Sequence, residues 1–459
     1  MTDIHEISGT TEVLGLIGNP VEHTLSPVIH NTLSERLNRN LVYLPFPVRD
    51  DPVQAVKGAF HLGIRGMNVT VPHKTAVIPA LSGIDPAAEV IGAVNTLVRT
   101  DEGFRGYNTD MPGLKRALAV NGISLSGKQV VILGAGGASR AAAALALFEG
   151  ASGIFLINRT KGKAEAIADD MKKHFKDHII PLSKDEYRQV PEAESVFIQC
   201  TSLGLKGKEG LLIEDRDFYR KAVYGYDLVY NPAETPFLKL FKELGIPGEN
   251  GLTMLLYQGM IAYELWTGET VTEDLAAQVL TQLKRKVYGE NILLAGFMGS
   301  GKSTVGRALA GLRGMDFLDT DTGIVEEQGR SIRDIFEEKG EEGFRDIETA
   351  YMERLSKTAV NTVIATGGGM VLRRENRELM KNTGRVVLLT ASEETTFQRV
   401  KEDNERPLLD SRGENELRTR ISRMLTARSA AYLAAADKVV ETDGKTVDEI
   451  LEEIQGGRS

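Results

Sequence analysis

Two glycine-rich turns constrain the fold of this chain more than any other feature of its sequence. The first lies in KQVVILGAGGASRAAAALALF, residues 128–148, and the second in NILLAGFMGSGKSTVGRALA, residues 291–310. Each turn joins an apolar, strand-like run to a helical pattern, which brings backbone N–H groups to a helix N-terminus where a phosphate can bind. The sequence therefore predicts two separate nucleotide-binding sheets in one chain.

Short apolar runs alternate with longer helical patterns along almost the whole chain. This alternation predicts βαβ units with mostly parallel sheets, and so an α/β fold. At about 150 residues per domain, the 459 residues suggest three or so domains. The charged stretch Lys284–Asn291 ends a helical pattern before a new strand, and a second division is expected near Lys128. Examples of the predicted strands are Val13–Ile17, Gln129–Leu133, Ile154–Ile157, Asn291–Ala295 and Val386–Thr390.

The composition limits the classes of partner. The net charge of −9 is moderate, and Lys and Arg are scattered, so neither nucleic acid nor an anionic membrane is suggested. Cys200 is the only cysteine, which fits a reducing cytoplasm. No apolar run approaches the roughly 20 residues of a membrane span, and the N-terminus MTDIHEISGT does not resemble a signal peptide.

The first glycine turn matches the dinucleotide pattern G-x-G-x-x-G at Gly134 and Gly136, whereas Ser139 stands at the third glycine position. The flanking strand and helix favour a nucleotide site over a turn that merely joins them. The residues expected to hold the pyrophosphate are Gly134, Ala135, Gly136, Gly137 and Ala138.

The next strand, GIFLIN, indicates which dinucleotide binds. An NAD site usually has an acidic residue at its end, but here Asn158, Arg159 and Thr160 stand there, with Lys163 nearby. A guanidinium and a hydroxyl suit a 2′-phosphate, which favours NADP. The alternative is that Arg159 is a solvated surface arginine.

Two segments upstream favour a site for a small polyol. GNPVEHTLSPVIHN places Thr24 and Ser26 on the same side of an extended piece before a helix. NVTVPHK presents Asn68, Thr70 and Lys74 from a strand and the turn after it. Each segment alone is also compatible with ordinary capping and turn chemistry.

These segments belong to a longer series of motifs that resembles the shikimate dehydrogenase family over residues 12–270. The series is GNPVEHTLSP, NVTVPHK, GAVNTLV, GYNTD, GAGGASRAA, DLVYNPAETP and GLTMLLYQG, in the order found in that family. The resemblance implies NADPH-dependent reduction of 3-dehydroshikimate to shikimate, with Lys74 and Asp110 as the catalytic pair. The substrate-binding residues it implies are Thr24, Ser26, Asn68, Thr70, Asn95, Tyr230 and Gln258.

The sequence departs from the family pattern at a few positions. Thr24 replaces a serine, and Gln199, Cys200 and Leu205 differ in QCTSLGL, a segment near the nicotinamide side of the cleft in that family. These departures affect the expected cofactor affinity and leave the catalytic pair intact. The alternatives are a module that oxidises quinate or uses NAD.

The second turn matches the complete P-loop pattern G-x-x-x-x-G-K-S from Gly296 to Ser303 and follows a strand. In such a loop the backbone wraps the phosphates, Lys302 reaches the β and γ groups, and Ser303 ligates Mg²⁺. The residues expected to bind the nucleotide are Gly299, Ser300, Gly301, Lys302, Ser303 and Thr304.

Motifs after the P-loop suggest the phosphoryl acceptor. Asp319 and Asp321 are two residues apart in a piece expected to be extended, and could supply a Mg²⁺ ligand and a base. Arg345 and Arg428 could clamp a carboxylate. Three further residues allow the backbone to approach a flat ring closely: Gly367, Gly368 and Gly369. Taken singly, each arginine could equally lie on a helix surface.

Together these motifs resemble shikimate kinase over residues 291–440. The resemblance implies that Asp321 activates the shikimate hydroxyl and that Asp319 holds Mg²⁺ with Ser303. It implies that Arg406, in the lid VKEDNERPLLDSRGEN, closes on the transferring phosphate and that Arg399 stacks near adenine. The implied shikimate-binding residues are Asp321, Arg345, Gly367, Gly368, Gly369 and Arg428.

The sequence thus predicts a cytoplasmic, bifunctional shikimate-pathway enzyme that uses NADP(H), ATP and Mg²⁺. Its partners are expected to be small molecules, with no nucleic acid and no membrane. A rival is that one module has lost catalysis. The expected domains are a substrate-binding domain at 1–107 completed by about 239–286, a Rossmann NADP domain at 108–238, and a P-loop nucleoside-kinase-like domain at 287–459.

Overall fold

The computed structural model describes residues 7–175, 179–401 and 413–456. The chain divides into two compact units, Met1–Leu283 and Lys284–Ser459, here called the N-terminal and C-terminal units. The division falls within α10 (Glu273–Tyr288). Within the described ranges, none of the helices has the length and apolar character needed to span a membrane.

The N-terminal unit begins with a six-stranded mixed sheet in the order β2-β1-β3-β5-β6-β4. β5 runs antiparallel to β3 and β6, and the remaining pairs are parallel. The strands are β1 (Glu12–Gly18), β2 (Leu41–Pro47), β3 (Gly66–Val69), β4 (Gly83–Ile84), β5 (Thr96–Arg99) and β6 (Phe104–Tyr107). The accompanying helices are α1 (Ser26–Arg36), α2 (Pro52–His61), η1 (Ile78–Ala80) and α3 (Pro86–Ile91).

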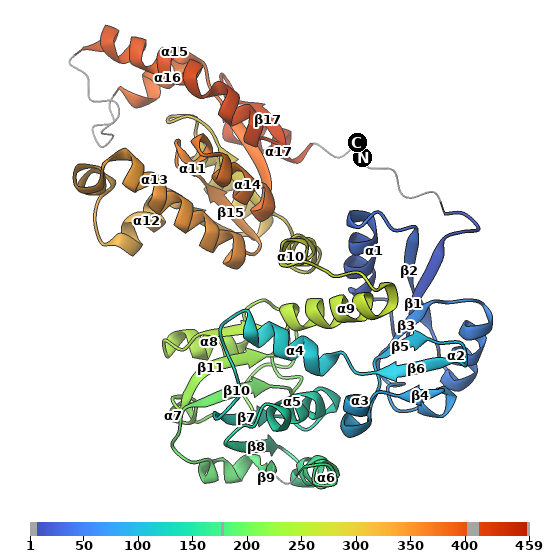
Figure 1. Cartoon of the computed structure of the whole chain (residues 1–459). Coiled ribbons are helices and arrows are strands. Elements are labelled where there is room, and N and C mark those ends of the chain that lie inside the picture. Colours follow the sequence, from blue (N-terminus) through green and yellow to red (C-terminus); the bar gives the residue numbers. More distant parts are fainter. Residues whose placement is uncertain (1–6, 176–178, 402–412, 457–459) are drawn as a thin grey trace. The chain divides into compact units, whose positions relative to one another are not determined.

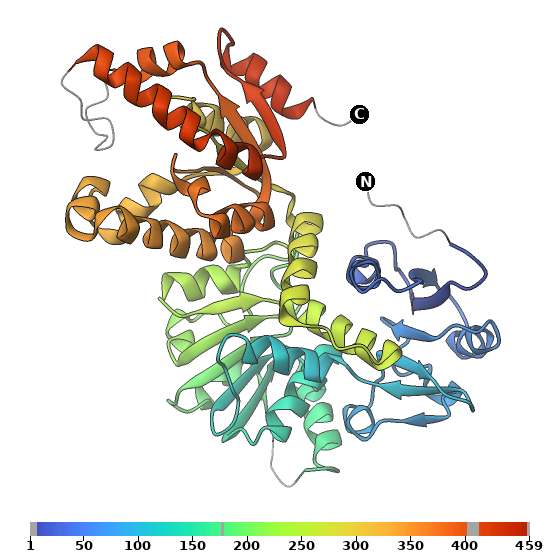
Figure 2. The same ribbon diagram turned by 45° about the horizontal axis from the view of Figure 1, so that its top comes forward.

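A second sheet of the same unit is entirely parallel, in the order β12-β11-β10-β7-β8-β9. This is the doubly wound Rossmann order, in which the strand order reverses beside β7. Figure 2 shows these strands side by side in green. They are β7 (Gln129–Leu133), β8 (Gly153–Asn158), β9 (Ile179–Ser183), β10 (Ser195–Gln199), β11 (Ala222–Asp227) and β12 (Gly248–Asn250). The helices are α4 (Asp110–Ala119), α5 (Gly137–Phe148), α6 (Lys161–Met171), η2 (Lys184–Gln189), α7 (Arg216–Tyr219) and α8 (Pro236–Glu243).

Helix α9 (Leu252–Thr267) connects the two halves of the N-terminal unit, since it packs against α4, α1 and β5 (Figure 1). α4 and α9 approach closely at Gly113, where an added Cβ would lie 2.8 Å from the backbone nitrogen of Gln258. At the other end of α9, the buried Trp266 fills the space above Gly66 and donates from Nε1 to the carbonyl of Leu97 at 2.8 Å. Helix α9 therefore joins the two halves of the N-terminal unit through its contacts with both.

The C-terminal unit contains a five-stranded parallel sheet in the order β14-β15-β13-β16-β17. Its strands are β13 (Asn291–Ala295), β14 (Asp316–Asp319), β15 (Thr362–Ala365), β16 (Gly384–Thr390) and β17 (Lys438–Glu441). Its helices are α11 (Lys302–Arg313), α12 (Thr320–Gln328), α13 (Ile332–Thr358), η3 (Met370–Leu372), α14 (Arg374–Thr383), α15 (Glu393–Val400), α16 (Glu414–Ala435) and α17 (Val447–Gln455). α13 is interrupted at Gly340, where φ is 71°.

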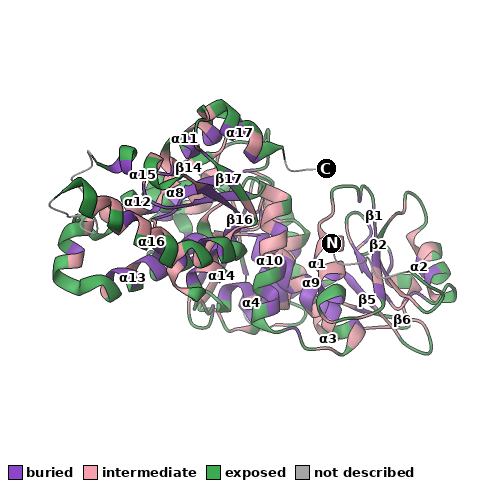
Figure 3. Ribbon diagram, turned by 90° about the horizontal axis from the view of Figure 1, so that it is seen from above, coloured by how far each residue is buried: buried purple, intermediate pink, exposed green. Residues whose placement is uncertain are grey.

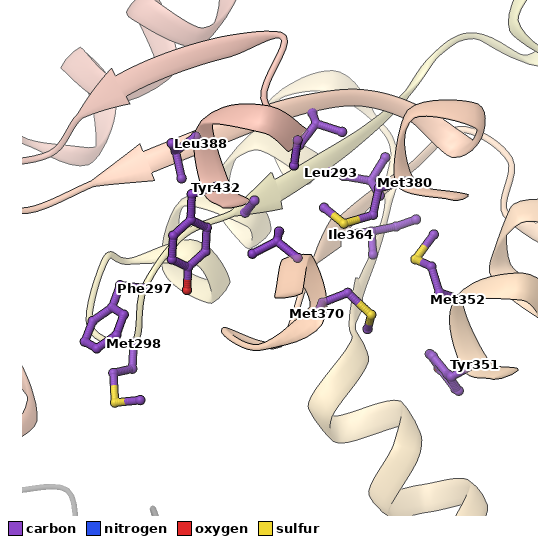
Figure 4. Close-up of a cluster of buried hydrophobic side chains, with 14 of the residues drawn as sticks. Leu293, Phe297, Met298, Tyr351, Met352, Ile364, Met370, Met380, Leu388 and Tyr432 are labelled. Atoms are coloured by element: carbon purple, nitrogen blue, oxygen red, sulfur yellow. The ribbon is translucent and has the colours of Figure 1, made fainter. Parts of the chain in front are cut away.

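Both faces of this sheet are covered, which explains why β13 is apolar from Ile292 to Ala295. Leu293 packs in one buried cluster and Ile292 in the cluster on the other face, as expected for a parallel strand between two layers of helices. Purple, buried segments accordingly follow the strands in Figure 3. Phe297 and Met298 of the phosphate loop lie in the first cluster with Tyr432 of α16 (Figure 4), so the core anchors the loop directly.

The α/β class and the predicted strands are confirmed, with some differences in detail. Gln129–Leu133 and Asn291–Ala295 have the predicted bounds, while each of the other three predicted strands is two residues longer in the structure. Two local predictions were wrong, because Ser26 already begins α1 and Asp321 lies in the first turn of α12. In the second case the Asp319 carboxylate caps the helix by accepting from the backbone N–H of Asp321, so the extended segment ends at Asp319.

Candidate active sites

A cavity of about 390 Å³ lies in the N-terminal unit, between segments of its two halves. Every residue that the sequence suggested for the catalytic pair and the substrate lines this one cavity. These residues are Thr24, Ser26, Asn68, Thr70, Lys74, Asn95, Asp110, Tyr230 and Gln258. Segments from β1 to α9 therefore converge on a single site, although they are far apart in the sequence.

Lys74 and Asp110 form an ion pair at the edge of the cavity. The Lys74 Nζ lies 2.6 Å from Oδ2 of Asp110, and Asn95 donates from Nδ2 to the other carboxylate oxygen at 2.8 Å. Asp110 is the first residue of α4, where the helix dipole favours a negative charge. The arrangement holds an ammonium group in a fixed direction beside a partly buried space, as a proton donor requires.

The other lining groups are neutral and hydrogen-bonding. Thr24 and Ser26 lie together, with the Thr24 hydroxyl donating to Oγ of Ser26 at 3.3 Å. Gln258 donates from Nε2 to the carbonyl of Leu255 at 2.8 Å, and burial raises the pKa of Tyr230. Hydroxyl and amide groups of this kind suit a ligand with several hydroxyl groups.

Asp227, at the end of β11, is a site-supporting residue that the sequence analysis did not single out. Its side chain is fully buried and accepts from the backbone N–H of Val229 at 2.9 Å and from the Thr235 hydroxyl at 2.6 Å. Burial raises the pKa of this carboxyl to about 7, despite these hydrogen bonds. The two hydrogen bonds hold together the loop that contains Tyr230, a residue of the cavity lining. Its position at the start of DLVYNPAETP was the available signal.

The first glycine turn lies between β7 and the first turn of α5, at the edge of the same cavity, which Ala138 also lines. Gly134 has φ of 107°, and an added Cβ would lie 2.9 Å from the Thr201 side chain. Ser139, at the third glycine position, accepts from the N–H of Gly136 at 3.0 Å and so stabilises the turn. The space above Gly136 and Gly137 is open, which fits a pyrophosphate at the N-terminus of α5.

The segment with the family departures packs against this turn. Gln199 donates to the carbonyl of Leu203 at 3.1 Å and accepts from the N–H of Thr201 at 2.9 Å. Burial raises the pKa of the neighbouring Cys200 to about 12, so the thiol stays protonated. The glutamine thus stabilises its own loop beside Gly134.

At the end of β8, Asn158 donates to the carbonyl of Thr160 at 2.9 Å, and Arg159 and Lys163 are exposed. Across the described ranges, no ion pair engages either of these cations. Lys161 differs, because it pairs with Glu186 at 2.8 Å. Two exposed cations therefore lie at or just after the end of β8, and their binding of a 2′-phosphate stays a prediction.

The second glycine turn lies between β13 and α11. Gly299 and Gly301 have φ of 76° and 90°, which non-glycine residues rarely adopt. Lys302 folds over the loop and donates from Nζ to the carbonyls of Gly296 at 2.9 Å and Phe297 at 3.1 Å. Gly299, Ser300 and Gly301 belong to the turn, and Lys302, Ser303 and Thr304 form the first turn of α11. These features fit the phosphates of ATP.

Ser303 and Asp319, the two residues predicted to bind Mg²⁺, lie in direct contact, since the Ser303 hydroxyl donates to Oδ2 of Asp319 at 2.6 Å. Where the chain is described, no group of three or more His, Cys, Asp or Glu side chains gathers for a metal. Two oxygen ligands beside a phosphate loop nevertheless suit Mg²⁺, because this ion takes its remaining ligands from phosphates and water.

The predicted acceptor residues also come together. An added side chain on Gly367 would collide with Asp321, and one on Gly369 would collide with the Arg345 guanidinium. The N–H of Gly367 donates to the Thr320 hydroxyl at 2.8 Å, which fixes the glycine triplet beside α12. Gly368 accepts from the Tyr432 hydroxyl at 2.5 Å.

Arg345 is nearly buried and pairs with Glu348 one turn along α13. Burial raises the pKa of Glu348 to about 6, while the adjacent guanidinium opposes this rise. Neither Glu348 nor Tyr432 was predicted from the sequence. Tyr432 lies one turn after Arg428 on α16. Arg399 donates to the carbonyl of Gly299 at 3.0 Å, beside the phosphate loop. Arg406 lies outside the described residues.

Comparisons with known proteins identify a family for each of the two units. The family described as "Shikimate dehydrogenase substrate binding domain" matches residues 16–97, "Shikimate / quinate 5-dehydrogenase" 116–204, "Shikimate 5'-dehydrogenase C-terminal domain" 251–280, and "Shikimate kinase" 298–456. The chain is 42% identical over 270 residues to a shikimate dehydrogenase (NADP(+)) of Caldanaerobacter subterraneus, covering 59% of this chain and 96% of that protein. It is 40% identical over 279 residues to that of Desulforamulus reducens, covering 60% and 96%.

Solved structures resemble the same part of the chain. Shikimate 5-dehydrogenase from Listeria monocytogenes, in complex with shikimate and NAD, has a TM-score of 0.57 and 33% identity, covering 61% of this chain and 99% of that one. The enzyme from Thermus thermophilus, in complex with NADP(H) and shikimate, has a TM-score of 0.52 and 30% identity, covering 59% and 99%. Over residues 16–280 the chain therefore belongs to the shikimate dehydrogenase family, and over residues 298–456 it carries a shikimate kinase domain.

Proposed function

We propose that this protein catalyses two consecutive reactions. The N-terminal unit reduces 3-dehydroshikimate to shikimate with NADPH, and the C-terminal unit phosphorylates shikimate with MgATP to shikimate 3-phosphate. The observation that carries the proposal is that each unit has a phosphate-binding glycine turn beside the groups its own reaction needs: the Lys74–Asp110 pair in one and the Ser303–Asp319 pair in the other. We assign the protein to the cytoplasm.

In the first reaction, bound NADPH supplies the hydride. Lys74 donates a proton to the oxygen of the reduced ketone, and Asp110 holds the ammonium in line and stabilises its charge. The neutral groups around the cavity bind the ring hydroxyls and carboxylate, which places the ketone beside the lysine.

In the second reaction, bound MgATP supplies the phosphoryl group. Asp321 accepts the proton of the attacking shikimate hydroxyl, and Arg345 and Arg428 bind the substrate carboxylate. Lys302 stabilises the negative charge that develops on the phosphate oxygens. We assign Arg406 the same role from the lid, and Arg399 a place near the adenine.

Product analysis tests the whole assignment. The purified protein is incubated with 3-dehydroshikimate, NADPH and MgATP, and each cofactor is left out in turn. We expect mass spectrometry to find shikimate 3-phosphate only when both cofactors are present, and shikimate to accumulate without ATP. Unchanged 3-dehydroshikimate in the complete mixture, with added shikimate still phosphorylated, would contradict the role given to the N-terminal unit.

Arg159→Ala tests the preference for NADP. Loss of a charge-assisted contact to the 2′-phosphate is expected to raise the KM for NADPH by about tenfold or more. The KM for NADH should change little, because NADH lacks that phosphate. Lys161→Ala is a matched control, since Lys161 is already paired with Glu186. An equal rise for both cofactors would indicate that Arg159 contacts something other than the 2′-phosphate.

A further inference from the structure

We propose that Tyr43 of β2 is a positioning residue for the dehydrogenase reaction, linking the substrate-binding groups to Asp110 through one directed chain of hydrogen bonds. Tyr43 does not line the cavity and is 1% exposed. Its hydroxyl donates to Oδ1 of Asn68 at 2.7 Å. The inference rests on the proposed function, in which Asn68 contacts the substrate.

The chain continues from Asn68 to the catalytic pair. Asn68 donates from Nδ2 to the Thr96 hydroxyl at 3.1 Å, and Thr96 donates to Oδ1 of Asn95 at 3.0 Å. Asn95 then donates from Nδ2 to Asp110 at 2.8 Å. Since a carboxylate only accepts and each amide has distinct donor and acceptor ends, all these bonds run in the same direction, from Tyr43 to Asp110.

This direction fixes what each amide can offer to the substrate. Both hydrogens of the Asn68 amide are used, by the Asn95 carbonyl and by Thr96, so Asn68 can only accept from the cavity. Oδ1 of Asn95 already accepts from Thr96 and from the backbone N–H of Thr109, so Asn95 can only donate. The ligand must therefore donate a hydrogen bond to Asn68 from one hydroxyl, and it must accept a hydrogen bond from Asn95 at another group.

The surroundings of Tyr43 hold its hydroxyl in place. The ring stacks on His30 of α1 with 4.2 Å between centroids, and Trp266 of α9 lies against the same histidine at 5.1 Å. Burial raises the pKa of Tyr43, so it remains a donor, and a hydrogen bond with Ser26 acts in the opposite direction. Burial also lowers the pKa of His30 to about 3, so the stacked ring is neutral. Tyr43 thus contacts two predicted substrate residues, Ser26 and Asn68, from behind.

Tyr43→Phe in the full-length protein tests this role, because it removes one oxygen and retains the stacked ring. We expect the KM for shikimate, measured with NADP⁺, to rise by about fivefold to tenfold, as for the loss of one buried hydrogen bond. The kcat should stay within about twofold. Tyr219→Phe is a matched control, since Tyr219 is buried and donates to the carbonyl of Ile213 at 3.0 Å, outside the cavity. Kinase turnover of the same sample gives the concentration of active protein.

A double-mutant cycle separates this inference from the proposed function. If Tyr43 acts through Asn68, Tyr43→Phe should add little to the KM of Asn68→Ala. If Tyr43→Phe raised the KM of Asn68→Ala by as much as it raises the KM of the unmodified protein, the inference would be overturned. It would also be overturned if Asn68→Ala raised the KM and Tyr43→Phe left it unchanged. No effect of Asn68→Ala would instead remove Asn68 from the substrate site. Should Tyr43→Phe not fold, Thr96→Val breaks the next link, and an unchanged KM there would equally overturn the chain.

Discussion

Lys74→Ala is expected to lower the turnover of 3-dehydroshikimate by about 10³-fold, in the range usual for the loss of a general acid. Removal of the ammonium leaves the reduced oxygen without a proton donor, and Asp110 without its 2.6 Å partner. The kinase reaction should be unaffected, because Lys74 belongs to the N-terminal unit. NADPH consumption and ADP release, measured on one sample, report the two activities separately.

The control for this variant is Lys57→Ala, which removes an exposed lysine from α2 of the same unit. It should leave both activities within about twofold, as surface substitutions usually do. Loss of both activities in a folded Lys74→Ala protein would mean that the two sites are not independent.

Lys302→Ala is expected to have the converse effect, lowering phosphorylation of shikimate by about 10³-fold and leaving reduction intact. Lys302 folds over the loop toward the carbonyls of Gly296 and Phe297, from where it can reach bound phosphates. Removal of its charge eliminates a preorganised contact to the transferring group. Release of ADP in the presence of saturating shikimate measures the loss.

Lys381→Ala on α14 provides the matched control, because that side chain is exposed in the same unit. Retention of substantial kinase turnover in Lys302→Ala would show that the P-loop lysine is dispensable here. That result would call for another cation at the phosphates, with Arg406 the first to test.

The sequence was most informative where function requires a local pattern. Gln129–Leu133 and Asn291–Ala295 were placed correctly because each buried strand is followed at once by its glycine turn. The groups around the N-terminal cavity could also be named in advance, since short motifs such as NVTVPHK contain them. Their catalytic and binding roles stay predictions until the variants are measured.

Buried residues that support the site residues without lining the sites could not be found in this way. Tyr43 is 25 residues from Asn68 in the sequence and contacts it only after β1, β2 and β3 pair. Tyr432 reaches the carbonyl of Gly368 across 64 residues, and the buried partner of Arg345, Glu348, is one of several glutamates on α13. Their importance depends on burial and on tertiary contacts, which no local motif encodes.

The position of Trp266 has a practical consequence. It is the only tryptophan of the chain, and it is 3% exposed in the N-terminal unit, with its indole against His30. Its fluorescence emission therefore reports the unfolding of the dehydrogenase unit alone, whereas far-ultraviolet circular dichroism sums both units. Recording both signals during one urea titration would give separate free energies of unfolding for the two units. A single transition midpoint cannot describe a protein whose units unfold separately.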